Sequence, residues 1–201
     1  MPTYKLIYFD LRGRAEPARM MFELAGVDYE DKRIPFGGEE WKQLKPTIGL
    51  GQLPVLEVDG KELPQTEAIF RYLAREHGFE PSSSWDRALV DVVNETVEDI
   101  GPGMIKVFEE KDPGKKPHLN NLEKLLKQNN GGTGWFVGDK ITLADVHAFG
   151  MLHDGIPPLI GADPGDLSYM KGQELLKAFI ERFKSEPKIA DWLKRRPKTP
   201  F

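Results

Sequence analysis

The pattern of apolar residues changes near residue 78. Before that point, short runs rich in β-branched and aromatic residues alternate with runs of helical periodicity, and after it only helical periodicity recurs. The turn-rich stretch GFEPSSSW (78–85) marks the change and indicates a linker. The sequence therefore predicts two domains: residues 1–78 with α/β structure, a linker at 79–84 and an all-helical domain at 85–201.

The first domain has the predicted order strand, helix, strand, a loop-rich passage, two strands and a helix. Pro17 in the first turn and Gly26 after the last turn bracket the first helix. Asp59-Gly60, between two strand-like runs, favours a two-residue hairpin turn. The resulting layer has mixed strand directions. We expect strands at 4–9, 28–34 (an edge strand), 53–58 and 61–64, and helices at 15–26 and 66–78, the latter capped by Thr66.

The second domain shows only helical patterns. Thr142 and Asp145 have the spacing of a capping box, so Asp145 is expected to start a helix rather than to act in catalysis. The basic stretch LKRRPK (193–198) is expected to be a solvated helix end. Gly101-Pro102-Gly103 predicts a kink in the first helix. The predicted helices are 85–111, 118–130, 142–155, 175–185 and 188–196.

Composition excludes several classes of protein. The net charge of −4 and the pI of about 5.7 argue against nucleic acid as a main partner. The chain has no cysteine, and its four histidines lack metal-ligand spacing, so we expect no disulfide, no nucleophilic cysteine and no metal. No apolar run approaches the ~18 residues of a membrane span, and the first ten residues do not resemble a signal peptide. A cytoplasmic protein without a membrane partner is expected.

Five motifs in order resemble the glutathione transferases, and in particular their sigma class, which includes haematopoietic-type prostaglandin D synthases. They are YKLIYFDLRGRAEPAR, GQLPVLEVDGKELPQT, AIFRYLARE, GDKITLADV and WLKRRPKT, and they extend along nearly the whole chain. The resemblance implies a thioredoxin-like amino-terminal domain followed by a helical bundle. It also implies that the reactive thiol arrives with glutathione as co-substrate, since the chain has none of its own.

The resemblance assigns catalysis to Tyr8, at the end of the first strand, with Arg14 lending orientation or positive charge. A free thiol has a pKa of ~8.5, and a hydrogen bond donated to the sulfur lowers it. A neutral tyrosine hydroxyl can donate that bond without being consumed. Tyr8 is therefore predicted to stabilise the glutathione thiolate.

The remaining residues implied by the resemblance bind the peptide part of glutathione. Trp41 and Lys45 lie four apart on one predicted helical face and would bind the glycine carboxylate. Leu53, before a predicted cis proline, would pair its backbone with the cysteinyl part. The start of the last helix would bind the γ-glutamyl carboxylate. The implied set is Tyr8, Arg14, Trp41, Lys45, Gln52, Leu53, Pro54, Gln65 and Thr66, with Glu98 of the partner subunit and Asp99 beside it for the ammonium.

An apolar electrophile is expected between the domains of a homodimer subunit. The candidate residues are Phe9, Leu11, Gly13, Met104, Phe108 and Phe201. Two other functions remain open. One is a glutathione-dependent isomerase of the prostaglandin D synthase type. The other is a non-catalytic protein that binds apolar ligands or serves as a crystallin, because a fold alone does not determine function.

Overall fold

The computed structural model describes residues 2–100 and 117–199, and the chain forms two compact units. The first unit contains the residues up to His77 together with the tail from Trp192, and the second runs from Gly78 to Asp191. The sequence interpretation had placed this tail in the helical domain. The tail belongs to the first unit because its side chains bond to residues near the start of the chain.

A four-stranded mixed sheet forms the centre of the first unit, with the order β2-β1-β3-β4. Strand β1 pairs in parallel with β2 and antiparallel with β3, and β3 pairs antiparallel with β4. Strand β2 is at an edge, as its alternating polarity predicted. The elements are β1 (Tyr4–Phe9), η1 (Gly13–Ala15), α1 (Glu16–Ala25), β2 (Glu30–Ile34), α2 (Glu39–Leu44), β3 (Val55–Val58), β4 (Lys61–Pro64) and α3 (Thr66–His77).

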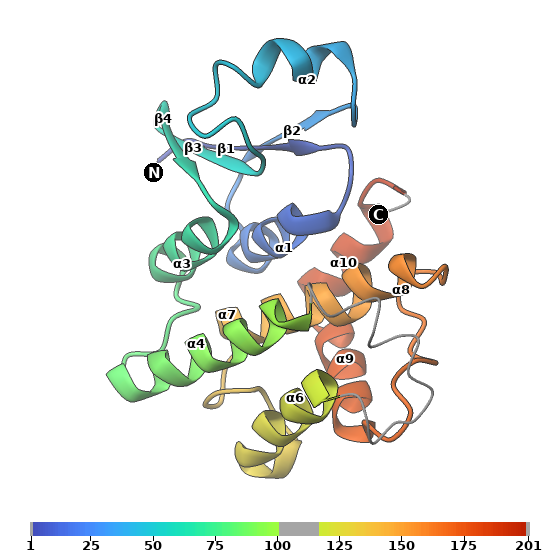
Figure 1. Ribbon diagram of the computed structural model, residues 1–201. Coiled ribbons are helices and arrows are strands. Elements are labelled where there is room, and N and C mark those ends of the chain that lie inside the picture. Colours follow the sequence, from blue (N-terminus) through green and yellow to red (C-terminus); the bar gives the residue numbers. More distant parts are fainter. Residues whose placement is uncertain (1, 101–116, 200–201) are drawn as a thin grey trace. The chain divides into compact units, whose positions relative to one another are not determined.

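Helices cover both faces of this sheet. Helices α1 and α3 lie together on one face, and α2 lies on the other (Figure 1). Leu6 of β1 and Phe22 of α1 are completely buried, as is Ile69 of α3. Helices α1 and α3 each bury one apolar stripe against the sheet, and that burial contributes most of the stability of such a layer.

The hairpin between β3 and β4 turns where the sequence predicted it. Asp59 and Gly60 both have positive φ angles, 48° and 78°. Two consecutive residues in this region are what a tight hairpin turn requires, and aspartate and glycine tolerate it best. Asp59 also accepts a hydrogen bond from the Thr3 amide at 2.8 Å, which fastens the turn to the start of the chain.

Helices form the second unit. Helix α4 packs against α6 and α7, and α9 packs against both of those. Their facing side chains, among them Val93, Leu122, Phe149 and Phe179, are buried. The elements are α4 (Ser84–Glu98), α6 (Pro117–Gln128), η3 (Asn130–Gly132), α7 (Leu143–Phe149), η4 (Gly150–Gly155), α8 (Ile156–Leu159), α9 (Glu174–Ser185) and α10 (Pro187–Arg195), whose last residues lie in the first unit.

The predicted helix 142–155 is wrong in its second half. Helix α7 ends at Phe149, and a wider π-helical segment follows through Gly155. The prolines at 157 and 158 lack backbone N–H groups, so they cannot continue the α-helical ladder. The carbonyl of His153 accepts a hydrogen bond from Gly165 instead, at 2.8 Å. The predicted kink at residues 101–103 lies outside the described residues.

The capping box at the start of α7 is confirmed. The Asp145 carboxylate accepts hydrogen bonds from the Thr142 amide (2.8 Å), the Thr142 hydroxyl (2.9 Å) and the Phe136 amide (2.8 Å). Asp145 is fully buried, so these donors satisfy a carboxylate that water does not reach. As predicted, Asp145 starts a helix.

The prediction of a solvated basic end is correct for Lys194, Arg195 and Lys198, which are exposed. It is wrong for Arg196, whose side chain is only 9% exposed and donates to Glu16 Oε1 at 2.8 Å. The local sequence of the tail contains no sign of this partner. No helix among the described residues has the length and apolar character needed to cross a membrane.

Candidate active site

The first unit contains a cavity of about 410 Å³ beside the carboxyl end of β1. It lies among segments that are far apart in the sequence: the β1–α1 loop, helix α2, the loop before β3 and the start of α3. Most of the predicted glutathione-binding residues line it. These are Arg14, Trp41, Gln52, Leu53, Pro54, Gln65 and Thr66, together with Phe9 from the predicted electrophile set.

Tyr8 is buried, and its hydroxyl points to the β1–α1 loop. The hydroxyl oxygen accepts a hydrogen bond from the Arg14 backbone N–H at 3.2 Å. Because the oxygen acts as an acceptor there, the hydroxyl proton can be donated to another group. A bond accepted in this way also polarises the hydroxyl and strengthens the bond that it donates. The arrangement suits stabilisation of an anion next to Arg14.

Gly13 fits closely against the Tyr8 hydroxyl. A Cβ at this position would lie 2.7 Å from the hydroxyl oxygen, and the φ angle of Gly13 is +40°. A side chain here would therefore strain the backbone and displace the phenol. Gly13, which the sequence interpretation assigned to the electrophile pocket, packs against the predicted catalytic group.

Replacing Gly13 by alanine is expected to lower glutathione-dependent activity about tenfold, because a small displacement of a positioned group costs that much. The matched control is Gly37→Ala. Gly37 also has a positive φ angle, +70°, but an added Cβ there would meet no atom within 4 Å. Steady-state kinetics of both variants separate the two effects. Equal losses in both variants would attribute the effect to backbone strain and contradict the role of the Tyr8 contact.

Trp41 lines the cavity, and Lys45 follows it one helical turn later. The Lys45 amide donates to the Trp41 carbonyl at 2.8 Å, so the two side chains share a face as predicted. The Trp41 indole packs edge-on against the Phe9 ring, with 5.3 Å between the ring centres. The exposed Lys45 side chain runs beside Gly51, which lines the cavity. An indole N–H and an ammonium are thus available for a carboxylate.

The loop before β3 has the predicted cis peptide bond between Leu53 and Pro54. Opposite it, Gln65 has a φ angle of +78°, a conformation that residues other than glycine rarely adopt. Such an outlier at a cavity points to a functional constraint. The Gln65 carbonyl accepts the first helical bond of α3, from Ile69 at 3.0 Å. Gln65 is therefore the N-cap, and the prediction that Thr66 fills this position is wrong by one residue.

Several predicted site residues are not among those that line this cavity, namely Tyr8, Leu11, Gly13, Lys45, Glu98 and Asp99. The Leu11 carbonyl accepts a hydrogen bond from Arg19 at 2.8 Å. Glu98 and Asp99 belong to the second unit, where Glu98 lies 3.3 Å from His147 Nε2 and Asp99 caps the end of α4. Met104, Phe108 and Phe201 lie outside the described residues.

The sequence interpretation missed three lining residues, namely Leu50, Gly51 and Pro64. Leu50 is 55% exposed. Gly51 has a φ angle of +61°. Gly51 is the first residue of the GQLP motif, and this glycine was the available signal, since a turn there brings the backbone to the cavity.

Two protein family models match this chain. Residues 4–75 match the family model described as glutathione S-transferase, N-terminal domain, and residues 104–196 match the model described as glutathione S-transferase, C-terminal domain. The chain belongs to the glutathione S-transferase family. The thioredoxin-like and helical parts expected from the sequence are confirmed.

Relatives in this family carry different names. The chain is 37% identical to S-crystallin SL11 of Nototodarus sloanii, covering 100% of both chains, and 39% identical to haematopoietic prostaglandin D synthase of Gallus gallus, covering 99% of both. A solved structure titled as a Nu-class GST from Haemonchus contortus has a TM-score of 0.86 and 36% identity, covering 100% of both chains. Another, titled as monomeric Na-GST-3 of Necator americanus, has a TM-score of 0.81 and 32% identity, covering 99% and 100%.

Proposed function

We propose that the protein transfers the glutathione thiolate to electrophilic carbon atoms of small apolar molecules, as a sigma-class enzyme with a role in detoxification. The observation that carries the proposal is the Tyr8 hydroxyl, which accepts from the Arg14 amide at 3.2 Å beside the 410 Å³ cavity. In the reaction, the sulfur lone pair forms the new carbon–sulfur bond. The leaving group departs with the electron pair of the bond that breaks.

Stabilisation of the thiolate explains the need for a phenol. A thiol with a pKa of ~8.5 is only a few per cent ionised at neutral pH. Lowering its pKa by about two units corresponds to about 2.7 kcal/mol of preferential interaction with the anion. A hydrogen bond from Tyr8, with Arg14 at the cavity wall, is of the right kind to supply this. The reaction requires no metal, because the phenol supplies the stabilisation.

The cavity offers complementary groups for the rest of glutathione. Lys45 and the Trp41 indole suit the glycine carboxylate, and the start of α3 at Thr66 suits the γ-glutamyl carboxylate, since the first N–H groups of a helix attract anions. Leu53 lies two residues before the start of β3, where a peptide can add to the backbone in the manner of a strand. Gln52 and Gln65 add polar side chains between these ends.

We propose that the ammonium of glutathione is bound by Glu98 of the partner subunit in a homodimer, with Asp99 beside it. His147 lies 3.3 Å from Glu98 in the same chain and would fix the direction of that carboxylate. Because one solved relative is titled as monomeric Na-GST-3, the proposed homodimer is to be tested by measuring the oligomeric state in solution. The cytoplasm is the proposed location, without a nucleic-acid or membrane partner.

Two alternatives have support from the relatives. The prostaglandin D synthase of Gallus gallus favours a glutathione-dependent isomerase, and S-crystallin SL11 favours a protein without turnover that binds or packs. The intact set of cavity residues favours conjugation over a crystallin role. Phe9, Leu11 and Gly13, with Met104, Phe108 and Phe201, remain the proposed surroundings of the electrophile.

The test is glutathione conjugation to chlorodinitrobenzene, with glutathione binding measured by calorimetry. Lys45→Ala is expected to raise the KM for glutathione about tenfold with little change in kcat, because one carboxylate contact is lost equally from ground and transition states. Lys42→Ala is the matched control: Lys42 lies on the same helix and pairs with Glu39 at 3.1 Å. Wild-type protein that neither binds glutathione nor reacts with it would contradict the proposal.

A further inference from the structure

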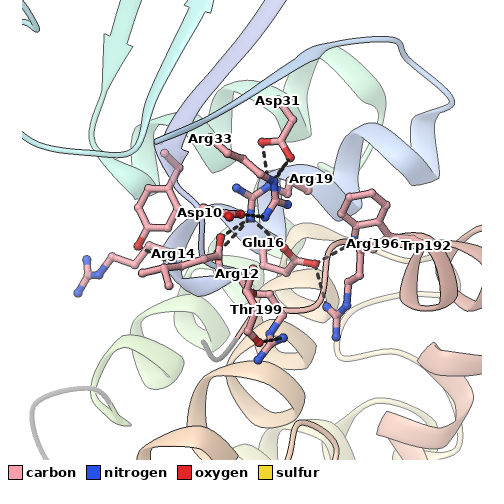
Figure 2. Close-up of polar contacts among 12 residues, drawn as sticks. Asp10, Arg12, Arg14, Glu16, Arg19, Asp31, Arg33, Trp192, Arg196 and Thr199 are labelled. Carbon is pink, nitrogen blue, oxygen red and sulfur yellow. Dashed lines mark hydrogen bonds and ion pairs between the residues drawn. The ribbon is translucent and has the colours of Figure 1, made fainter. Parts of the chain in front are cut away.

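Glu16, the first residue of α1, is a buried carboxylate with partners from the far end of the chain. It is 1% exposed. Its Oε1 accepts from the Trp192 indole N–H at 2.8 Å and from Arg196 Nη1 at 2.8 Å. Its Oε2 accepts from Arg19 Nη1 at 3.0 Å. Figure 2 shows Glu16 between these groups, with the tail on one side and Arg19 on the other.

Arg19 connects Glu16 to the loop that carries the proposed catalytic groups. Its Nη1 also donates to the backbone carbonyls of Leu11 at 2.8 Å and Arg12 at 3.3 Å. Its guanidinium carbon lies 6.0 Å from the centre of the Tyr8 ring. The carbonyls that it binds are two and three residues away from Arg14, whose amide donates to the Tyr8 hydroxyl. The β1–α1 loop is thus bonded to the guanidinium that Glu16 orients.

A second bond fastens the tail to the same loop. Arg12, 5% exposed, donates from Nη1 to the Thr199 carbonyl at 2.6 Å. Arg12 and Glu16 precede and follow Gly13 and Arg14 in the sequence. Each of the two binds the tail, and Figure 2 shows both contacts. The other charged groups of the cluster are arranged around Asp31, which accepts from Arg19 Nε at 3.1 Å and Arg33 Nε at 2.7 Å, and Arg33 also donates to Asp10 at 3.2 Å.

We propose that the tail from Trp192 to Thr199 is a positioning element for the active site, with Arg196 and Trp192 fixing Glu16 and, through Arg19, the loop that orients Tyr8 and Arg14. This inference rests on the proposed function of Tyr8. It extends the site to Trp192 and Arg196, which lie 176 and 180 positions after Glu16 in the chain.

Loss of Arg196 is expected to disfavour the bound thiolate in two ways, through the geometry of the loop and through charge. Without Arg196, the buried Glu16 carboxylate keeps only one of its two arginine partners, so Arg19 is drawn towards it and its bonds to the loop weaken. The same change removes one positive charge from the cluster around Glu16, whose Arg19 lies 6.0 Å from the Tyr8 ring, and this loss disfavours an anion there. Loss of Arg196 is therefore expected to raise the pKa of glutathione bound at the site. A purely structural fastening would lower stability and leave that pKa unchanged.

The test compares wild type, Arg196→Met, Arg196→Lys and the matched control Lys194→Met. Lys194 is an exposed cation on the same helix. The ultraviolet absorbance of the bound thiolate is titrated against pH, and kcat and KM are measured on the folded proteins. For Arg196→Met, we expect a thiolate midpoint about one pH unit higher, kcat about threefold lower at about pH 7, and a nearly unchanged KM for glutathione. Arg196→Lys should recover part of the effect, and Lys194→Met should resemble wild type.

An unchanged thiolate midpoint and kcat in Arg196→Met would overturn the inference, whatever the stability of the variant. Failure of the proposed function has a different signature, because wild type itself would then show no thiolate signal. In that case amide hydrogen exchange of the β1–α1 loop, measured on protein without glutathione, decides the inference. Faster exchange in Arg196→Met than in Lys194→Met would support positioning by the tail, and equal exchange would refute it.

Discussion

Replacing Tyr8 by phenylalanine is expected to lower the rate of glutathione conjugation about 50-fold at about pH 6.5 and to leave it almost unchanged at about pH 9. With the phenol, a bound thiol whose pKa is lowered by about two units is half ionised at the lower pH. Without the phenol, only about one per cent is ionised there, and both proteins contain mostly thiolate at the higher pH. The hydroxyl that accepts from Arg14 at 3.2 Å is thus expected to act by shifting an ionisation.

Rates measured from about pH 6 to 9 with a chloronitrobenzene substrate test this prediction, and Tyr4→Phe is the control. Tyr4 lies on the same strand and is also buried, but its ring packs against Phe22 and His77, whereas the Tyr8 hydroxyl bonds to the Arg14 amide. Its hydroxyl can be removed without affecting the proposed site. A Tyr8→Phe variant that is equally slow at every pH would indicate that Tyr8 shapes the site without stabilising a thiolate. A variant as fast as wild type at every pH would remove Tyr8 from the mechanism.

The sheet and the cavity were predictable because their determinants are local. Asp59-Gly60 set the hairpin, and the GQLP motif carried the family's cis proline at 54, which the structure contains. Trp41 and Lys45 share a face through helical spacing alone. The position of Gln65 at the N-cap was missed by one residue. Its positive φ angle depends on the connection from β4 to α3, which local preference does not specify.

The cluster around Glu16 could not be predicted in this way. The spacing of Arg12, Glu16 and Arg19 is compatible with an exposed, charged helix face, which is the usual outcome for such residues. Burial of these charges depends on Arg196 and Trp192, and no pattern in the first twenty residues indicates a contact with the tail. Long-range pairing of charges is decided by tertiary structure, so the sequence interpretation assigned the tail to solvent.

Replacing Asp145 by alanine is expected to destabilise the helical unit by about 3–5 kcal/mol, the largest effect on stability predicted for this chain. The variant would leave the amides of Phe136 and Thr142 buried without their acceptor, and it would remove the cap of α7. Urea denaturation followed by circular dichroism measures the change. Asp139→Ala is the control, because Asp139 is an exposed aspartate in the same loop. Equal stability of the two variants would contradict the role of the capping box.

The ionisation of Asp145 gives this prediction a pH dependence. Burial raises the pKa of Asp145 from 3.8 to about 6, although the hydrogen bonds from Phe136 and Thr142 oppose the rise. Between these two values the folded protein retains a proton that the unfolded chain releases. The contribution of this group to stability is therefore greatest below about pH 4, falls as the pH rises towards about 6, and is constant above that.

Asp145→Asn removes this ionisation while keeping the size of the side chain. The unfolding free energy of wild type minus that of Asp145→Asn should accordingly be larger at about pH 4 than at about pH 7. Because other carboxylates titrate equally in both proteins, the difference isolates Asp145. If it stays constant over this range, the pKa of Asp145 is the same in the folded and the unfolded protein. Its three hydrogen bonds would then balance the cost of burying the charge.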